Sequence, residues 1–187
     1  MERRMLLQGL LVGALAPPAR ADEATWALLG RGGYAVLMRH AVTEPGVGDP
    51  PGFRLGVCAT QRNLSEEGRR DARRLGEELR ARRVPVAGLL SSPWCRCVDT
   101  ARLAFGREPE IEPALGNLFG RAELEAAQVS ALRAMVARPI AGGSVFMVTH
   151  GSTTHVLTGV SPGTAEMVLV EPQPGGALRV AGRLSVR

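Results

Sequence analysis

Two adjacent side chains with complementary chemistry follow a short apolar stretch near the start of the chain. Residues 35–38 are Ala-Val-Leu-Met, Arg39 and His40 come next, and a segment rich in proline and glycine begins after them. This pattern predicts a buried strand over residues 34–38 that ends in a loop. Arginine presents a fork of donors that suits phosphate, and histidine is a nucleophile and a proton carrier near neutral pH. The pair is therefore a candidate phosphoryl-transfer centre, unless it is simply a solvated strand end.

Two further apolar stretches end close to residues of the same kinds. Residues 86–90 lead through a Ser-Ser-Pro turn to Arg96, and residues 145–148 lead through Thr149 to His150. Ligands of open α/β sheets bind outside the carboxyl ends of the strands. If the three strands are parallel neighbours, two arginines and two histidines meet at one end of the sheet. Taken singly, Arg96 could be a surface arginine and His150 a core histidine bonded to a backbone carbonyl.

The remaining pattern predicts the elements that would position these side chains. Ser65 is a helix cap followed by two acids, and the helix after it has an apolar stripe and a charged, solvated face. Strands alternate with helices through most of the chain, and the last two strands, at about residues 166–170 and 178–186, read as a hairpin. We therefore expect an α/β fold: a three-layer α/β/α domain around a central, mostly parallel, mixed sheet.

The first residues have the pattern of a secretory signal. A charged start is followed by an apolar run over residues 5–16 and by the small-x-small site Ala19-Arg20-Ala21. We expect a signal peptide over residues 1–21 and a single domain over residues 22–187, in a periplasmic or secreted protein. The apolar run, at about 12 residues, is short for a membrane span. An uncleaved N-terminal anchor helix is the alternative.

Composition gives little support to nucleic-acid binding. All 23 basic residues are arginine, and without the predicted signal peptide 20 basic and 17 acidic residues remain, a net charge of +3. Many of the arginines share one helix with acids, so the high isoelectric point overstates the basic character. Aromatic residues make up 4% of the chain, which leaves few side chains for stacking on bases.

Four blocks of the sequence, in order and in register, resemble the histidine phosphatase superfamily, which has the phosphoglycerate-mutase-like fold. The resemblance runs from about residue 33 to residue 172. The blocks are Leu37-Met38-Arg39-His40 with Thr43-Glu44, Leu64-Ser65-Glu66-Glu67-Gly68-Arg69-Arg70-Asp71-Ala72, Leu90-Ser91-Ser92-Pro93 with Arg96 and Thr100-Ala101, and Val148-Thr149-His150-Gly151.

The resemblance implies a phosphoryl transfer in two steps. His40 would attack phosphorus to form a phosphohistidine, which water then hydrolyses. Arg39, Arg96 and His150 would hold the three equatorial oxygens, in keeping with a reaction that depends on positioning and charge stabilisation. The family fixes the tautomer of its nucleophile through a backbone carbonyl, and we expect the same of His40. No cofactor and no metal are implied, and no histidine spacing resembles a metal site.

The chain departs from the family at two points. Ala41 follows His40 where the family usually has glycine. The proton donor for the leaving group is unknown, because the region after residue 114 does not match the family's acid motif. That region offers Glu123 and Glu125, and Glu123 is the candidate, although carboxylates on a helix surface are usually solvated.

Two further residues near the predicted site could have a role or none. Arg62 precedes the second block, near the expected mouth of the site, and is a candidate substrate-binding residue or a plain surface arginine. His155 follows His150 by five positions. On a helix it would point elsewhere, so we expect it to be structural.

The chain has three cysteines, and an exported protein would meet an oxidising compartment. We favour a disulfide between Cys58 and Cys95. Cys95 neighbours Arg96, and Cys58 lies in a loop that should pass above the same site. Such a bridge would stabilise the fold by about 3–4 kcal/mol in a loop-entropy model. The alternative pairing is Cys58 with Cys97, and a zinc site does not fit the spacing.

The favoured function is a metal-independent phosphatase that hydrolyses phosphate monoesters of small substrates. The alternative is a non-catalytic phosphate-binding or scaffold domain of the same fold, which would keep the phosphate cradle without turnover. A mutase is disfavoured, because the short insertions leave little to hold a substrate while it reorients. The natural substrate and the oligomeric state are not indicated by the sequence.

Overall fold

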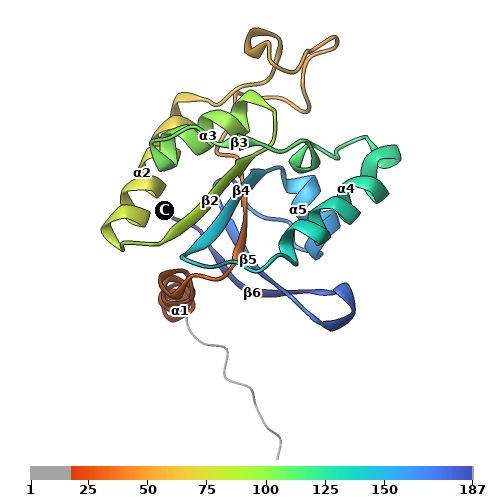
Figure 1. The fold of residues 1–187 in the computed structure, drawn as a ribbon. Helices are drawn as coiled ribbons and strands as arrows, with labels where there is room; N and C mark the ends of the chain where they lie inside the picture. The colour runs from red at the N-terminus through yellow and green to blue at the C-terminus, as the bar shows by residue number, and fades with distance from the viewer. Residues whose placement is uncertain (1–17, 187) are drawn as a thin grey trace, which may run out of the picture.

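A computed structural model describes residues 18–186 of the chain, and its centre is a six-stranded sheet (Figure 1). The strands lie in the order β3-β2-β4-β1-β5-β6. Their bounds are β1 Ala35–Arg39, β2 Val86–Ser91, β3 Glu110–Ile111, β4 Ser144–Thr149, β5 Met167–Pro172 and β6 Leu178–Leu184. The helices are α1 Pro18–Arg31, α2 Glu66–Ala81, α3 Cys95–Phe105, α4 Ala122–Val136 and α5 Gly151–Thr158, with short 3₁₀ turns at Cys58–Thr60, Pro113–Leu115 and Pro174–Gly176.

The sheet is mixed, as predicted. Strand β4 pairs in parallel with β1 on one side and β2 on the other, and β2 pairs in parallel with β3. Strands β5 and β6 are antiparallel and form the predicted hairpin at one edge. The strands β1, β4 and β2 are thus parallel neighbours, and their carboxyl ends meet at the same edge of the sheet.

Helices cover both faces of the sheet, which confirms the three-layer architecture (Figure 1). Side chains of α1, α2 and α3, such as Leu29 and Leu75, pack with Val36, Met38 and Phe146 on one face. Side chains of α4 and α5 pack on the other face, against residues that alternate with these along β1 and β4. The central strands are therefore buried on both sides, as their continuous apolar runs indicate.

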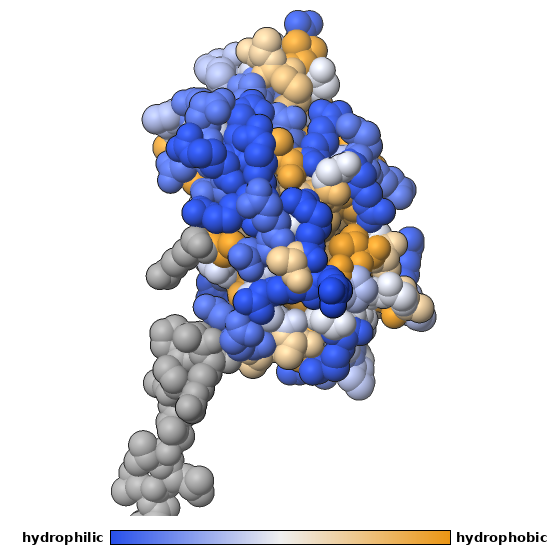
Figure 2. Space-filling view, turned by 90° about the vertical axis from the view of Figure 1, so that its left-hand side faces the viewer, coloured by the Kyte–Doolittle hydropathy of each residue, from blue (hydrophilic) through white to orange (hydrophobic). Residues whose placement is uncertain are grey.

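Helix α2 packs very closely against the loop that follows the first strand. Ser65 caps it by accepting a hydrogen bond from the Gly68 amide, as expected from the sequence. A Cβ atom at Gly68 would lie 1.9 Å from the Val42 carbonyl oxygen, so only glycine allows this approach two residues after His40. The apolar stripe of α2 is buried, and its charged side contributes to the hydrophilic face seen in Figure 2.

The predicted signal peptide lies almost wholly outside the described residues. Helix α1 begins at Pro18 and so includes the predicted cleavage site. Cleavage after Ala21 stays a prediction. Within residues 18–186, no helix is both long enough and apolar enough to cross a membrane.

Candidate active site

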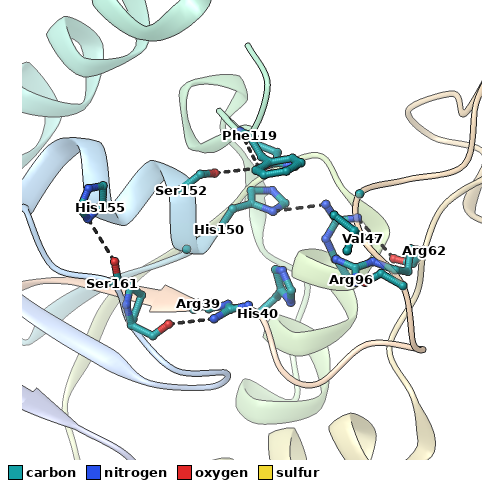
Figure 3. A pocket seen from close by; sticks show the side chains of 15 residues that line it. Arg39, His40, Val47, Arg62, Arg96, Phe119, His150, Ser152, His155 and Ser161 are labelled. Carbon is teal, nitrogen blue, oxygen red and sulfur yellow. Dashed lines mark hydrogen bonds between the residues drawn. The ribbon is translucent and has the colours of Figure 1, made fainter. Parts of the chain in front are cut away.

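A pocket of about 500 Å³ lies at the carboxyl ends of β1 and β4 and brings together the four residues singled out in the sequence (Figure 3). Arg39 is the last residue of β1 and His40 follows it. Arg96 is the second residue of α3, and His150 immediately precedes α5. Both helices therefore begin beside the pocket, and helix N-termini favour anions.

His40 is held as a neutral imidazole with one free nitrogen. Its side chain is buried, and its Nδ1 lies 2.9 Å from the carbonyl oxygen of Ala41. A carbonyl only accepts, so Nδ1 carries the proton and Nε2 keeps a lone pair. The pKa of His40 is lowered to about 3, chiefly by burial; the Ala41 carbonyl opposes this shift, and the charges of Arg96, Arg39 and Arg62 add to it. At neutral pH the ring can therefore act as a nucleophile through Nε2.

The Arg39 guanidinium lies beside the start of α5. Its Nη1 donates to the carbonyl oxygen of Pro162 at 2.9 Å, whereas its buried Nε has no partner. A Cβ atom at Gly151 would lie 3.4 Å from that Nε, an ordinary van der Waals distance, so the start of α5 lies directly against the guanidinium. Burial lowers the pKa of Arg39, which remains a cation at neutral pH.

Arg96 is almost completely buried and is paired with Asp49, a residue that the sequence analysis missed. Asp49 Oδ1 accepts from Arg96 Nη1 at 2.7 Å, and Oδ2 accepts from Nη2 at 3.3 Å. Oδ2 also accepts from the Trp94 indole, and Oδ1 from the Arg62 amide. Burial alone would raise the pKa of Asp49, but the hydrogen bonds and the charge of Arg96 lower it overall. The carboxylate is therefore ionised.

His150 is buried behind the pocket and bonded at both ring nitrogens. Its Nε2 lies 2.8 Å from the hydroxyl of Ser92 and its Nδ1 lies 3.5 Å from Arg96 Nη2. Burial lowers the pKa of His150 well below its ordinary value, and the neighbouring His40 and the arginines act in the same direction. A hydroxyl can donate or accept, so Ser92 supports either neutral tautomer. Arg96 Nη2 only donates, so in the contact seen here Nδ1 accepts and the proton lies on Nε2, toward Ser92. In the other tautomer, which Ser92 also supports, His150 would present an Nδ1–H to an oxyanion without gaining a net proton.

Three guanidinium groups line the pocket, and their arrangement suits a phosphate. Arg39, Arg62 and Arg96 each have a buried Nε without a hydrogen-bond partner. Buried donors without partners are rare and call for a ligand or water. Among the described residues, the lining of this pocket contains no Asp or Glu. The site is therefore electropositive and presents unpaired N–H groups.

The loop that carries Asp49 is fastened to the start of α3. A disulfide joins Cys58 to Cys95, the pairing favoured from the sequence, and Cys97 is a buried free thiol. Next to the disulfide, the Gln61 side chain accepts from the Cys95 amide at 3.0 Å. These contacts hold the loop against the helix that supplies Arg96.

The structure also places the residues whose roles the sequence left open. Arg62 lines the pocket, and its Nη1 donates to the Gly46 carbonyl. Glu123 is exposed on the first turn of α4 and does not line the pocket, so the structure does not bring this candidate donor to the site.

His155 lines the same pocket, and the expectation that it points elsewhere is wrong. A five-residue helical spacing from His150 does not apply, because the backbone at His150 is extended, with φ −114° and ψ 158°. The helix begins at Gly151, and residues four apart on a helix share a face. Gly151 and His155 therefore both face the pocket, and His155 Nδ1 lies 3.1 Å from the Ser161 hydroxyl (Figure 3).

Comparison with protein families identifies the chain. A family model described as the histidine phosphatase superfamily (branch 1) matches residues 35–128, half of the chain. The chain belongs to the histidine phosphatase superfamily. This match includes Arg39, His40 and Arg96 but ends before His150, which the fold brings beside them. A search of curated proteins found no significant match.

Solved structures of histidine phosphatases share the fold at low sequence identity. The protein histidine phosphatase SixA complexed with tungstate is 18% identical, with a TM-score of 0.57, over 81% of this chain and 96% of that one. A mycobacterial glucosyl-3-phosphoglycerate phosphatase in complex with VO₃ is 17% identical, with a TM-score of 0.60, over 83% and 100%. A SixA protein from Agrobacterium tumefaciens is 21% identical, with a TM-score of 0.53, over 83% and 99%.

The ionisation state of His40 can be measured directly. Folded His40 should stay neutral and protonated on Nδ1 from pH 8 down to pH 5, because its pKa is lowered to about 3. The ring ¹⁵N shifts, assigned by comparison with a His40→Ala variant, should be flat over that range. A midpoint near the ordinary histidine value would contradict the account. Since unfolded His40 binds a proton below about pH 6.5 and folded His40 does so only near pH 3, the free energy of unfolding should fall as the pH falls from about 6.5 toward 3.

The disulfide makes a prediction about thiol content. The unreduced protein, unfolded in denaturant, should react with one equivalent of thiol reagent, at Cys97, because Cys58 and Cys95 are joined. Reduction should lower the free energy of unfolding by about 3–4 kcal/mol. Three reactive thiols in the unreduced protein would contradict the pairing.

Proposed function

We propose that this protein is an exported phosphatase that hydrolyses phosphate monoesters through a phosphohistidine on His40. The observation that carries the proposal is the state of His40: a neutral imidazole with its Nδ1–H tied to Ala41 and with Nε2 available in a pocket lined by three arginines. A neutral nucleophile does not repel a phosphate dianion, and the arginines supply the charge that binds it.

The first step transfers the phosphoryl group to the protein. Nε2 of His40 forms a bond to phosphorus while the bond from phosphorus to the ester oxygen breaks, and the leaving group takes the electron pair. The N–H groups of Arg39 and Arg96 stabilise the negative charge on the equatorial oxygens. His150 Nδ1–H donates to the third oxygen in the tautomer that Ser92 supports.

The second step restores the protein. Water attacks phosphorus in line, the bond to Nε2 breaks, and inorganic phosphate leaves with the water oxygen. The Nδ1–H bond to Ala41 persists through both steps, so the imidazole keeps one orientation as nucleophile and as leaving group.

The proton for the ester oxygen does not come from a carboxyl group in the lining of the pocket, because the described lining residues include none. Water or the substrate itself supplies it in this proposal. Esters with leaving groups that are stable as anions should therefore react fastest. The pocket, at about 500 Å³, falls in the range of small-molecule sites, so it has room for an organic group beside the phosphate.

Export is part of the proposal. The signal-like first residues and the disulfide between Cys58 and Cys95 support an oxidising location, periplasmic or extracellular. The likeness in fold to phosphatases solved with tungstate and VO₃, both oxyanions, supports a site that binds a phosphoryl group.

Turnover of p-nitrophenyl phosphate in the presence of a chelator tests the proposal. His40→Ala should lose more than about 10³-fold in kcat/KM, because the nucleophile is removed. Arg96→Ala should lose about 10²–10³-fold, because a donor to the transition state is removed. Arg73→Ala removes the same charge from the exposed side of α2 and should retain wild-type activity.

The same assay identifies the alternatives. Binding of inorganic phosphate without turnover in the wild type would favour the non-catalytic phosphate-binding domain. Equal turnover in the wild type and His40→Ala would show that another group is the nucleophile. Loss of activity on chelation would contradict a metal-independent reaction.

A further inference from the structure

Asp49 is a buried carboxylate whose hydrogen bonds go to Arg96, Trp94 and Arg62, two of which line the pocket. Its side chain is 4% exposed. It accepts four hydrogen bonds: two from Arg96, one from the Trp94 indole at 3.0 Å and one from the Arg62 amide at 3.1 Å. It does not line the pocket, so it cannot itself contact a bound phosphate.

The way in which Asp49 holds Arg96 decides which N–H groups remain for a ligand. A guanidinium has two edges that can hold an anion by two bonds: the end edge formed by Nη1 and Nη2, and the side edge formed by Nη2 and Nε. Asp49 occupies the end edge, at 2.7 and 3.3 Å. The side edge retains a buried Nε without a partner, and among the described residues the only contact of its Nη2 on that side is a long one of 3.5 Å to His150 Nδ1, which a phosphate oxygen would replace.

We propose that Asp49 is a positioning residue that turns the Nη2–Nε edge of Arg96 toward the transferred phosphoryl group. The role rests on the phosphatase function proposed above, and it is exerted entirely through Arg96. A freely rotating arginine would lose orientational entropy on binding phosphate, whereas a fork already fixed by a carboxylate does not. Asp49 also balances one of the three arginine charges of the pocket.

The loop around Asp49 keeps it in place. Residues 44–63 contain only a short 3₁₀ turn at Cys58–Thr60, so the position of Asp49 depends on specific contacts. The Glu44 amide donates to the Asn63 carbonyl at 3.0 Å across the base of the loop. At its far end the loop is tied by the disulfide from Cys58 to Cys95, the residue next to Arg96.

A double-mutant cycle distinguishes positioning from a general effect on folding. Asp49→Asn should lower kcat/KM for p-nitrophenyl phosphate by about 10²-fold in the wild type, because the amide cannot accept both arginine bonds. In an Arg96→Ala background the same change should lower it by less than about threefold. Asp49→Asn should also weaken inhibition by inorganic phosphate in the wild-type background but not in the Arg96→Ala background. Equal losses in the two backgrounds would overturn the proposal, as would unchanged or higher activity of Asp49→Asn.

Two further variants keep the test decisive. Asp99→Asn removes a carboxylate from a partly exposed ion-pair cluster between α2 and α3 and should leave kcat/KM unchanged. If Asp49→Asn does not fold, Asp49→Glu keeps the charge pair but displaces the guanidinium. It should melt near the wild-type temperature and lose about tenfold in kcat/KM. Wild-type activity in a folded Asp49→Glu variant would overturn the proposal.

The readout also separates this inference from the proposed function. If the wild type binds inorganic phosphate but does not turn over substrate, the phosphatase assignment fails. The cycle is then measured as phosphate affinity by calorimetry. Weaker binding in Asp49→Asn that disappears in the Arg96→Ala background would still support positioning, and an unchanged affinity would overturn it.

Discussion

The hydrogen bond from His40 Nδ1 to the Ala41 carbonyl is the contact on which the chemistry of this site depends. Nδ1 lies 2.9 Å from the Ala41 carbonyl oxygen, so the bond fixes the proton on Nδ1 and leaves Nε2 as a base. The surrounding arginines and the burial of the ring then keep the imidazole neutral. Without that bond the ring could rotate or change tautomer, and the arginines would surround a group that is not a nucleophile.

The fold satisfies this constraint by placing chain segments that are distant in sequence at one sheet edge. Parallel pairing of β4 with β1 and β2 brings His150 and the start of α3 beside Arg39 and His40. The close packing of α2 at Gly68 fixes the chain just after His40. Gathering three arginines leaves a positively charged pocket with unpaired N–H groups. Asp49 neutralises part of that charge through its ion pair with Arg96.

The parts that could be predicted from the sequence are those encoded by local patterns. The cap at Ser65, the apolar stripe of α2 and the continuous apolar strands depend on neighbours within a few residues. The convergence of Arg39, Arg96 and His150 followed from one assumption, that their strands are parallel neighbours. The family resemblance covered the same residues.

The parts that could not be predicted depend on loop geometry and exact helix boundaries. Asp49 lies in a loop without periodicity, and its partner Arg96 is 47 residues away, so no local pattern indicates the pair. The available signal for Asp49 was its position as a carboxylate among glycines and prolines. A buried arginine needs such an acidic partner. His155 was misplaced because the helix starts at Gly151 and not at His150.

Trapping of the phosphorylated protein tests the central claim most directly. Wild-type protein would be mixed with a phosphate ester, quenched within milliseconds in alkali, which preserves phosphohistidine, and examined by peptide mass spectrometry and ³¹P NMR. The account predicts one phosphoryl group on His40, attached to Nε2, because Nδ1 is bonded to Ala41. A phosphoryl group on Nδ1 or on another residue would contradict it, as would turnover without any covalent adduct.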